Sequence, residues 1–127
     1  MQGVHLTADL SGCPADAGLM LDGEALRAHC VTAVETAGLG AVAQLFHRFT
    51  PAPGQPEDGP CGITGVVLLA ESHLAVHTWP ELGSVTLDVY VCNLATDNSA
   101  KAEVLMNLLI APFKPLHVGR QRLLRGQ

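Results

Sequence analysis

Apolar and polar residues alternate in short segments along most of the chain, the pattern of β-strands that bury one face. Stretches that contain Gly and Pro separate these segments, as turns do. Segment 62–70 differs, because it is a nearly continuous apolar run, typical of a strand covered on both faces. Strands are predicted at 4–10, 41–49, 62–70, 73–78, 85–92 and 116–124.

Two other segments carry apolar residues at helical spacing. The first begins after Asp22, a residue type that caps helices, and ends near Ala37, just before Gly38. The second follows the potential N-cap residues 96–99 and runs to about Ile110. The residues predicted to face inward are Leu26, Cys30, Ala33, Val34 and Ala37 in the first helix, and Val104, Leu105, Leu108 and Leu109 in the second.

The order β-α-β-β-β-β-α-β predicts an α+β fold, a two-layer sandwich whose largely antiparallel sheet carries two helices on one face. A length of 127 residues fits a single domain over 1–127. Between the second and third strands, residues 50–61 contain four prolines and are therefore expected to form a surface loop.

Composition narrows the class of protein. Apolar residues make up 48% of the chain and charged residues 15%, so we expect a globular fold with some apolar surface buried against a partner chain. The net charge of −5, without a basic aromatic stripe, argues against nucleic-acid binding. No apolar run reaches membrane-spanning length, and no signal peptide is recognised. Four cysteines without a C-x-x-C pair favour a cytoplasmic protein with reduced thiols.

Candidate chemistry is concentrated in residues 68–81, which read LLAESHLAVHTWPE. His73 and His77 lie four residues apart, about 13 Å along a strand and too far for one ion, so no metal is expected. Ser72 lacks the G-x-S-x-G elbow of hydrolases. Taken alone, Ser72 is best explained as a polar residue at a strand break, and Cys92 as a small core residue.

The joint arrangement of these residues favours a shared function instead. Ser72 follows Glu71 at a strand junction, and His77 lies five residues after it. Thr64 precedes Ser72 by eight residues and Cys92 follows it by twenty. Each lies near the end of a neighbouring strand, so pairing of the strands can draw a serine, a histidine and a thiol together.

Over most of its length the chain resembles the bacterial and archaeal pyruvoyl-dependent S-adenosylmethionine decarboxylases. The likeness begins with HLTADLSGC (5–13), FHRF (46–49) and GITGVV (62–67). It is most specific in ESHLAVHTWPE (71–81) and continues through LDVYVCN (87–93).

The resemblance implies that the chain cleaves itself between Glu71 and Ser72, into residues 1–71 and 72–127, and converts Ser72 into a pyruvoyl cofactor. His77 and Thr64 are the implied processing residues. The pyruvoyl ketone forms a Schiff base with the substrate amine and draws in electrons as carbon dioxide leaves. Cys92 is the implied proton donor. The product supplies aminopropyl groups for the synthesis of spermidine and other polyamines.

Substrate-binding residues are implied in the same way. Phe49 corresponds to an aromatic residue that stacks on adenine, and Glu81 to a glutamate that holds the ribose hydroxyls. Trp79 is interpreted as a wall of the same pocket. A homodimer of cleaved protomers with shared sites is expected, in which one chain supplies Ser72 and Cys92 and its partner supplies Phe49, Thr64, His77 and Glu81.

Three features depart from the family pattern. The Pro-rich loop 51–61 is longer than usual, Thr64 stands where serine is common, and Asn93 follows the thiol where glycine is common. Two alternatives therefore remain open from the sequence. One is a pyruvoyl-dependent decarboxylase of a basic amino acid such as arginine or ornithine, and the other is an unprocessed, non-catalytic homologue.

Overall fold

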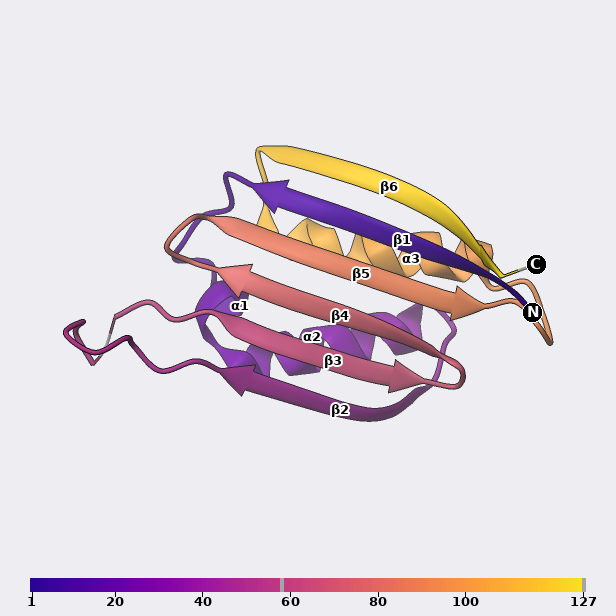
Figure 1. The fold of residues 1–127 in the computed structure, drawn as a ribbon, viewed down its shortest axis with the longest axis horizontal. Coiled ribbons are helices and arrows are strands. Elements are labelled where there is room, and N and C mark those ends of the chain that lie inside the picture. Colours follow the sequence, from indigo (N-terminus) through magenta and orange to yellow (C-terminus); the bar gives the residue numbers. More distant parts are fainter. Residues whose placement is uncertain (58, 127) are drawn as a thin grey trace.

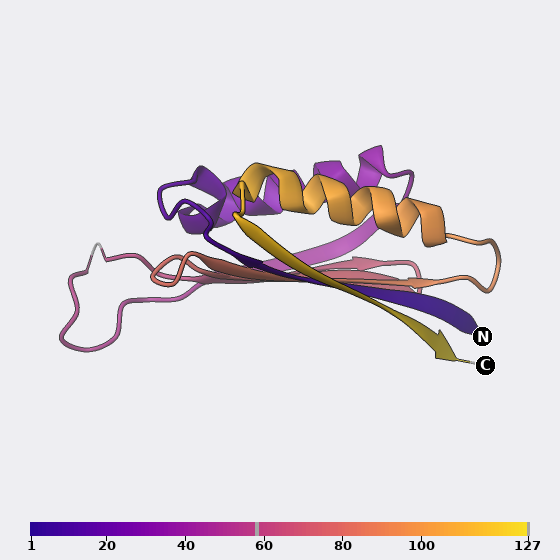
Figure 2. The same cartoon turned by 90° about the horizontal axis from the view of Figure 1, so that it is seen from above.

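The computed structural model describes residues 1–57 and 59–126. They form an antiparallel sheet of six strands in the order β2-β3-β4-β5-β1-β6. The strands are β1 (Gln2–Ser11), β2 (Ala41–Arg48), β3 (Ile63–Leu69), β4 (Ser72–Trp79), β5 (Ser84–Cys92) and β6 (His117–Gly126). The helices are α1 (Gly18–Leu21), α2 (Gly23–Thr36), α3 (Ser99–Ile110) and the 3-10 turn η1 (Ala111–Phe113). All helices lie on one side of the sheet (Figure 1, Figure 2), which confirms the predicted two-layer α+β sandwich.

The core lies between the sheet and the helices. Every second residue of the inner strands is buried there, as the alternation in the sequence predicts. Leu74 and Val76 of β4, for example, are fully buried, as are Leu26 of α2 and Leu105 of α3. Burying a side chain of this size stabilises the fold by about 2 kcal/mol, so this layer supplies much of the driving force.

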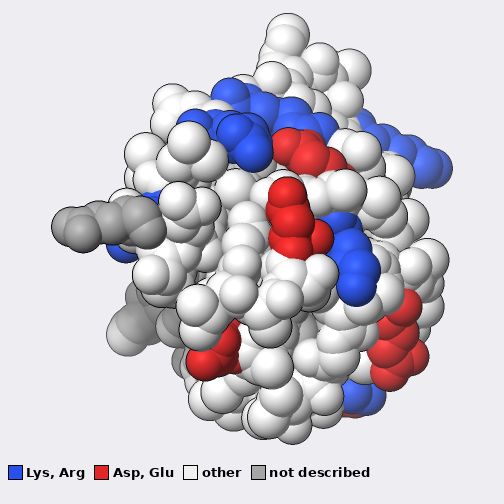
Figure 3. Space-filling view, turned by 90° about the vertical axis from the view of Figure 1, so that its right-hand side faces the viewer, with Lys and Arg blue, Asp and Glu red and all other residues white. Residues whose placement is uncertain are grey.

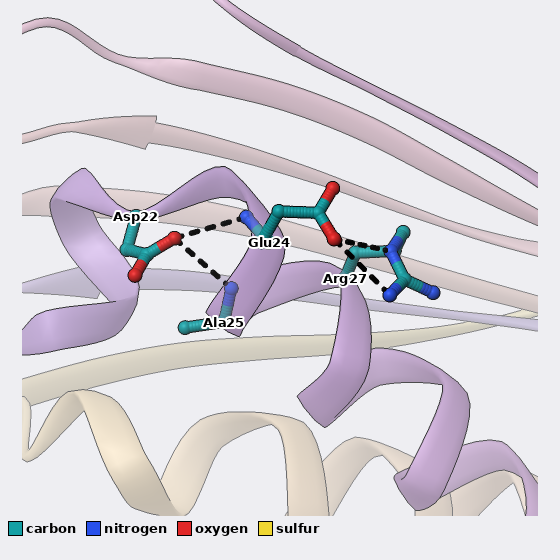
Figure 4. A network of polar contacts seen from close by, with 4 residues as sticks. All are labelled: Asp22, Glu24, Ala25 and Arg27. Carbon is teal, nitrogen blue, oxygen red and sulfur yellow. Dashed lines mark hydrogen bonds and ion pairs between the residues drawn. The ribbon is translucent and has the colours of Figure 1, made fainter.

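Helix α2 begins and ends as its sequence predicts. The Asp22 carboxylate accepts hydrogen bonds from the main-chain N–H groups of Glu24 and Ala25, which have no partner within the first helical turn (Figure 4). Glu24 also pairs with Arg27 one turn later. At the other end Gly38 has φ of 85°, a left-handed conformation that glycine adopts without steric cost.

Helix α3 differs in part from the prediction. Its buried stripe consists of Ala102, Leu105, Met106 and Leu109. Val104 was predicted to face inward but is 46% exposed, so that assignment is wrong. The segment is apolar on most of its circumference, and hydrophobic periodicity alone therefore does not identify the face that packs against the sheet.

The face of the sheet opposite the helices is open in the single chain. Within the described residues no helix covers it (Figure 2). Val66 and Leu68 of β3 project from this face, and Leu68 is 48% exposed. The apolar run 62–70 predicts cover on both faces, but this chain covers only one of them. None of the described helices is long and apolar enough to span a membrane.

Candidate active site

The junction between β3 and β4 is a tight turn of two residues, Ala70 and Glu71. Leu69 pairs directly with Ser72, which closes the hairpin around them. Glu71 has φ of 54°, in the left-handed region that is unfavourable for a residue with a Cβ atom. The bond proposed from the sequence for self-cleavage therefore follows a residue with an unfavourable backbone conformation.

Ser72 and Cys92 come together at this end of the sheet, as expected from the sequence. The main-chain N–H of Cys92 donates a hydrogen bond to Ser72 Oγ over 3.1 Å. Cys92 is the last residue of β5 and is 8% exposed. The hydroxyl is thus held by the backbone of the residue whose thiol is the candidate proton donor.

The loop between β5 and α3 fixes this backbone through contacts that the sequence does not predict. The Asn98 side-chain amide donates to the Cys92 carbonyl oxygen over 2.9 Å. The Asn98 main-chain N–H in turn donates to Asn93 Oδ1 over 2.8 Å, and the Asn93 amide donates to Ser99 Oγ. Asn98 lies among the residues predicted as N-caps, so its type suggested a helix start rather than a contact with Cys92.

Thr64 and His77 form a second group on the open face. They face each other across the β3–β4 pair, and Thr64 Oγ1 lies 3.0 Å from His77 Nδ1. The imidazole stacks on the indole of Trp79, with ring centroids 5.9 Å apart. These three residues line a cavity of about 350 Å³ together with Phe49 and Glu81.

A second cavity of about 640 Å³ adjoins the first and shares Phe49, Gly62 and Glu81 with it. The Pro-rich loop forms its outer wall, mainly through apolar side chains. The Phe49 N–H donates to the Gly62 carbonyl oxygen over 2.9 Å, which closes the base of this loop. The Pro-rich loop therefore borders the space next to the predicted substrate-binding residues.

The two groups lie at opposite ends of the open face. Strand β4 begins at Ser72 and ends at Trp79. The Pro-rich loop lies at the Trp79 end, so Ser72 is at the end of the sheet away from this loop (Figure 1). Five residues of strand separate Ser72 from His77, a distance of roughly 16 Å. Within one chain, His77 and Thr64 therefore do not reach the Ser72 hydroxyl. The expectation that strand pairing draws the serine, the histidine and the thiol together thus holds for Ser72 and Cys92 but not for His77 of the same chain.

At the Ser72 end, uncharged residues make up much of the surface, with basic side chains along the top and separate acidic and basic side chains near the centre and lower edge (Figure 3).

Other titratable side chains are better explained by the fold. Burial raises the pKa of the Cys30 thiol to about 12 and also raises that of Cys13, so both thiols stay protonated and unreactive. His5 Nε2 contacts Asp88 Oδ1 at 3.0 Å on the open face. Across the described residues, no three His, Cys, Asp or Glu side chains cluster as metal ligands would.

Comparison with known proteins matches nearly the whole chain to one family. The S-adenosylmethionine decarboxylase family matches residues 4–126. An S-adenosylmethionine decarboxylase proenzyme of Picrophilus torridus is 36% identical over 124 residues, 98% of this chain and 84% of that protein. A proenzyme of the same name from Aquifex aeolicus is 38% identical over 125 residues, with 98% and 81% covered.

A solved structure gives the same result. The crystal structure of the adenosylmethionine decarboxylase from Aquifex aeolicus VF5 superposes with a TM-score of 0.82 at 35% identity, covering 98% of this chain and 91% of that one. The sequence matches and the structural match each cover 98% of this chain. The chain therefore belongs to the S-adenosylmethionine decarboxylase family.

Proposed function

We propose that this protein is a self-processing decarboxylase of S-adenosylmethionine that uses a pyruvoyl group formed from Ser72. The observation that carries the proposal is the Ser72 end of the sheet in a chain of this family. There, a serine follows a left-handed glutamate and shares a hydrogen bond with the backbone of Cys92. The decarboxylated product would supply the aminopropyl donor for polyamine synthesis.

The residues at this end fit a pyruvoyl group. Ser72 is half-buried at the start of β4, and cleavage before it would leave the new group fixed to a paired strand. When formed, the pyruvoyl group supplies a ketone that withdraws electrons from the bond to the departing carboxylate. The Cys92 thiol, on the residue whose N–H contacts Ser72 Oγ, would deliver a proton to the carbon that loses carbon dioxide.

The cavity at the other end suits a nucleoside. Phe49 is 49% exposed and Trp79, whose indole stacks on His77, is still 36% exposed, so both retain aromatic surface for stacking and for cation–π attraction to a sulfonium. Glu81 lines both cavities with an exposed carboxylate that can accept hydrogen bonds from ribose hydroxyls. We assign Thr64 and His77, which contact each other over 3.0 Å, to the processing of a neighbouring chain.

In a homodimer, the Ser72 end of one chain and the Phe49–Glu81 cavity of the other can form one site. If the open faces of two chains pack about a two-fold axis, the Ser72 end of one chain can lie against the cavity of its partner. Each shared site then takes Ser72 and Cys92 from one chain and Phe49, Thr64, His77 and Glu81 from the other. The uncovered apolar side chains of the open face, such as Val66 and Leu68, support this packing.

Intact mass under denaturing conditions tests the processing. The wild-type protein should give fragments 1–71 and 72–127, the second blocked at its N-terminus by the ketone, while Ser72→Ala should remain one inactive chain. A wild-type chain that stays uncleaved after prolonged incubation would reject the pyruvoyl mechanism and favour a non-catalytic homologue.

Carbon dioxide release from a substrate panel tests the chemistry. Release from S-adenosylmethionine is expected, whereas release from arginine or ornithine alone would reassign the substrate. Cys92→Ala should still cleave but should turn over poorly, with frequent inactivation by protonation at the wrong carbon. Full activity of this variant would exclude Cys92 as the proton donor.

A further inference from the structure

The turn that precedes Ser72 has an unusual geometry for its place in the sheet. Two-residue hairpin turns normally have positive φ at the first loop residue or at both, because only these turns match the twist of the strands. Here Glu71, the second loop residue, has the positive φ of 54°, and Ala70 does not. This is the pattern of a type II turn, which requires Gly or Asn at the second position.

The turn just before the Glu71–Ser72 peptide bond therefore has two unfavourable features. The turn type opposes the twist of β3 and β4, and its left-handed position holds a glutamate instead of a glycine. Among the described residues Glu71 and Lys114 are the two non-glycine residues with positive φ, and only Glu71 lies beside the candidate site. Such strain persists only where the surrounding structure enforces it.

The surrounding structure enforces it through β4. Ser72 pairs with Leu69 on one side, and its hydroxyl accepts the Cys92 N–H on the other. The second contact also fixes the oxygen that must attack. Both contacts come from the same chain, so the strained bond and its nucleophile are arranged before any partner binds.

We infer that the strained Ala70–Glu71 turn, with the Cys92 N–H as anchor for the attacking oxygen, drives the first step of self-cleavage. In this step Ser72 Oγ bonds to the Glu71 carbonyl carbon, and the bond from that carbon to the Ser72 nitrogen breaks. The hydroxyl proton ends on the released amine, so no co-reactant is needed. The inference rests on the proposed self-processing function and names the groups that promote it.

The acyl shift relieves the strain for a geometric reason. In the amide, one nitrogen atom connects the Glu71 carbonyl carbon to the Ser72 Cα. In the ester, Oγ and Cβ make this connection, so the turn becomes one atom longer. The longer turn no longer has to hold Glu71 in the left-handed region. The energy stored in the precursor is thus released along the reaction.

Glycine at position 71 tests this directly, because glycine adopts positive φ freely. Glu71→Gly should slow formation of fragments 1–71 and 72–127 by about tenfold, measured by denaturing mass spectrometry against time. In a Ser72→Ala background, which cannot cleave, the same change should raise the melting temperature by about 3 °C. The two readouts link slower cleavage to lost strain and do not depend on decarboxylase activity.

Two matched variants complete the experiment. Glu71→Gln keeps the side-chain length and the strain but removes the charge, so it should cleave at the wild-type rate. Lys114→Gly relieves the comparable conformation (φ of 48°) far from the turn, so it should stabilise the protein without changing cleavage.

The inference is overturned if Glu71→Gly cleaves as fast as the wild type, if it leaves the melting temperature unchanged, or if Glu71→Gln is equally slow. An uncleaved wild-type chain would instead reject the proposed function itself.

Discussion

Mixed dimers of an inactive variant and a strongly impaired variant test the shared site most directly. The perturbation is co-expression of Ser72→Ala chains with Glu81→Ala chains, each with a different affinity tag so that the heterodimer can be purified. In a shared site, Ser72 of the second chain meets Glu81 of the first, and that pocket is intact. The other pocket carries both substitutions and is inactive.

The structure sets the size of the expected recovery. Ser72 and Trp79 lie at opposite ends of β4, seven residues or roughly 23 Å apart, so Ser72 and Glu81 of one chain do not meet in one pocket. One intact pocket of two predicts about half of the wild-type activity per heterodimer. Losing the bonds from a carboxylate to the ribose should leave a Glu81→Ala homodimer with about 1–10% of wild-type kcat/KM.

Carbon dioxide release at a substrate concentration below KM measures the recovery. A heterodimer of Ser72→Ala with Leu82→Ala is the control, because Leu82 is 70% exposed beside Glu81 and lines neither cavity. It should also retain about half of the activity, which shows that an uncleaved chain does not inactivate its partner. Activity of the test heterodimer no higher than that of the Glu81→Ala homodimer would place each site within one chain.

Three further predictions concern single residues. Asn98→Asp removes the donor to the Cys92 carbonyl and so loosens the backbone that holds Ser72 Oγ; cleavage should slow, kcat should fall about tenfold and wrong-carbon inactivation should increase. Asn107→Asp on the exposed face of α3 should change none of these. Phe49→Leu should raise KM about three- to tenfold without slowing cleavage, and an unchanged KM would exclude stacking. Burial lowers the pKa of His29, so the unfolded chain binds a proton more readily and stability should decline as pH falls below about 6.5. Thermal melts of His29→Gln should lack this decline, since glutamine can keep the hydrogen bond to Leu108.

The strands could be predicted from the sequence because alternation reports directly on a sheet with one covered face. Leu74 and Val76 point to the helices and His73 and His77 to the open face, as their positions in the sequence indicate. Helix α3 was harder to predict, because its apolar residues nearly surround it. Its packing against the sheet buries Met106 and leaves Val104 exposed.

The sequence identifies the residues of the candidate site but only part of the contacts between them. The contact between Ser72 and Cys92 follows from the pairing of β4 with β5, which alternation and short turns already favoured. The bond from Asn98 to Cys92 depends on how the loop after β5 folds, and no periodicity reports on that. The positive φ of Glu71 could not be predicted from the sequence either, because glutamate is not a residue type typical of turns.

The separation of His77 from Ser72 has a consequence for the order of events in maturation. The turn, the hydroxyl and the Cys92 N–H already lie together in one chain, whereas Thr64 and His77 are some 16 Å further along the sheet. In a single chain, the strained turn and the Ser72 hydroxyl therefore lie next to the Glu71–Ser72 bond, but Thr64 and His77, the groups proposed to assist its cleavage, do not. If those groups come from a partner, dimerisation precedes cleavage, and the precursor is cut only where a complete site will result. The same open face would then control both assembly and maturation.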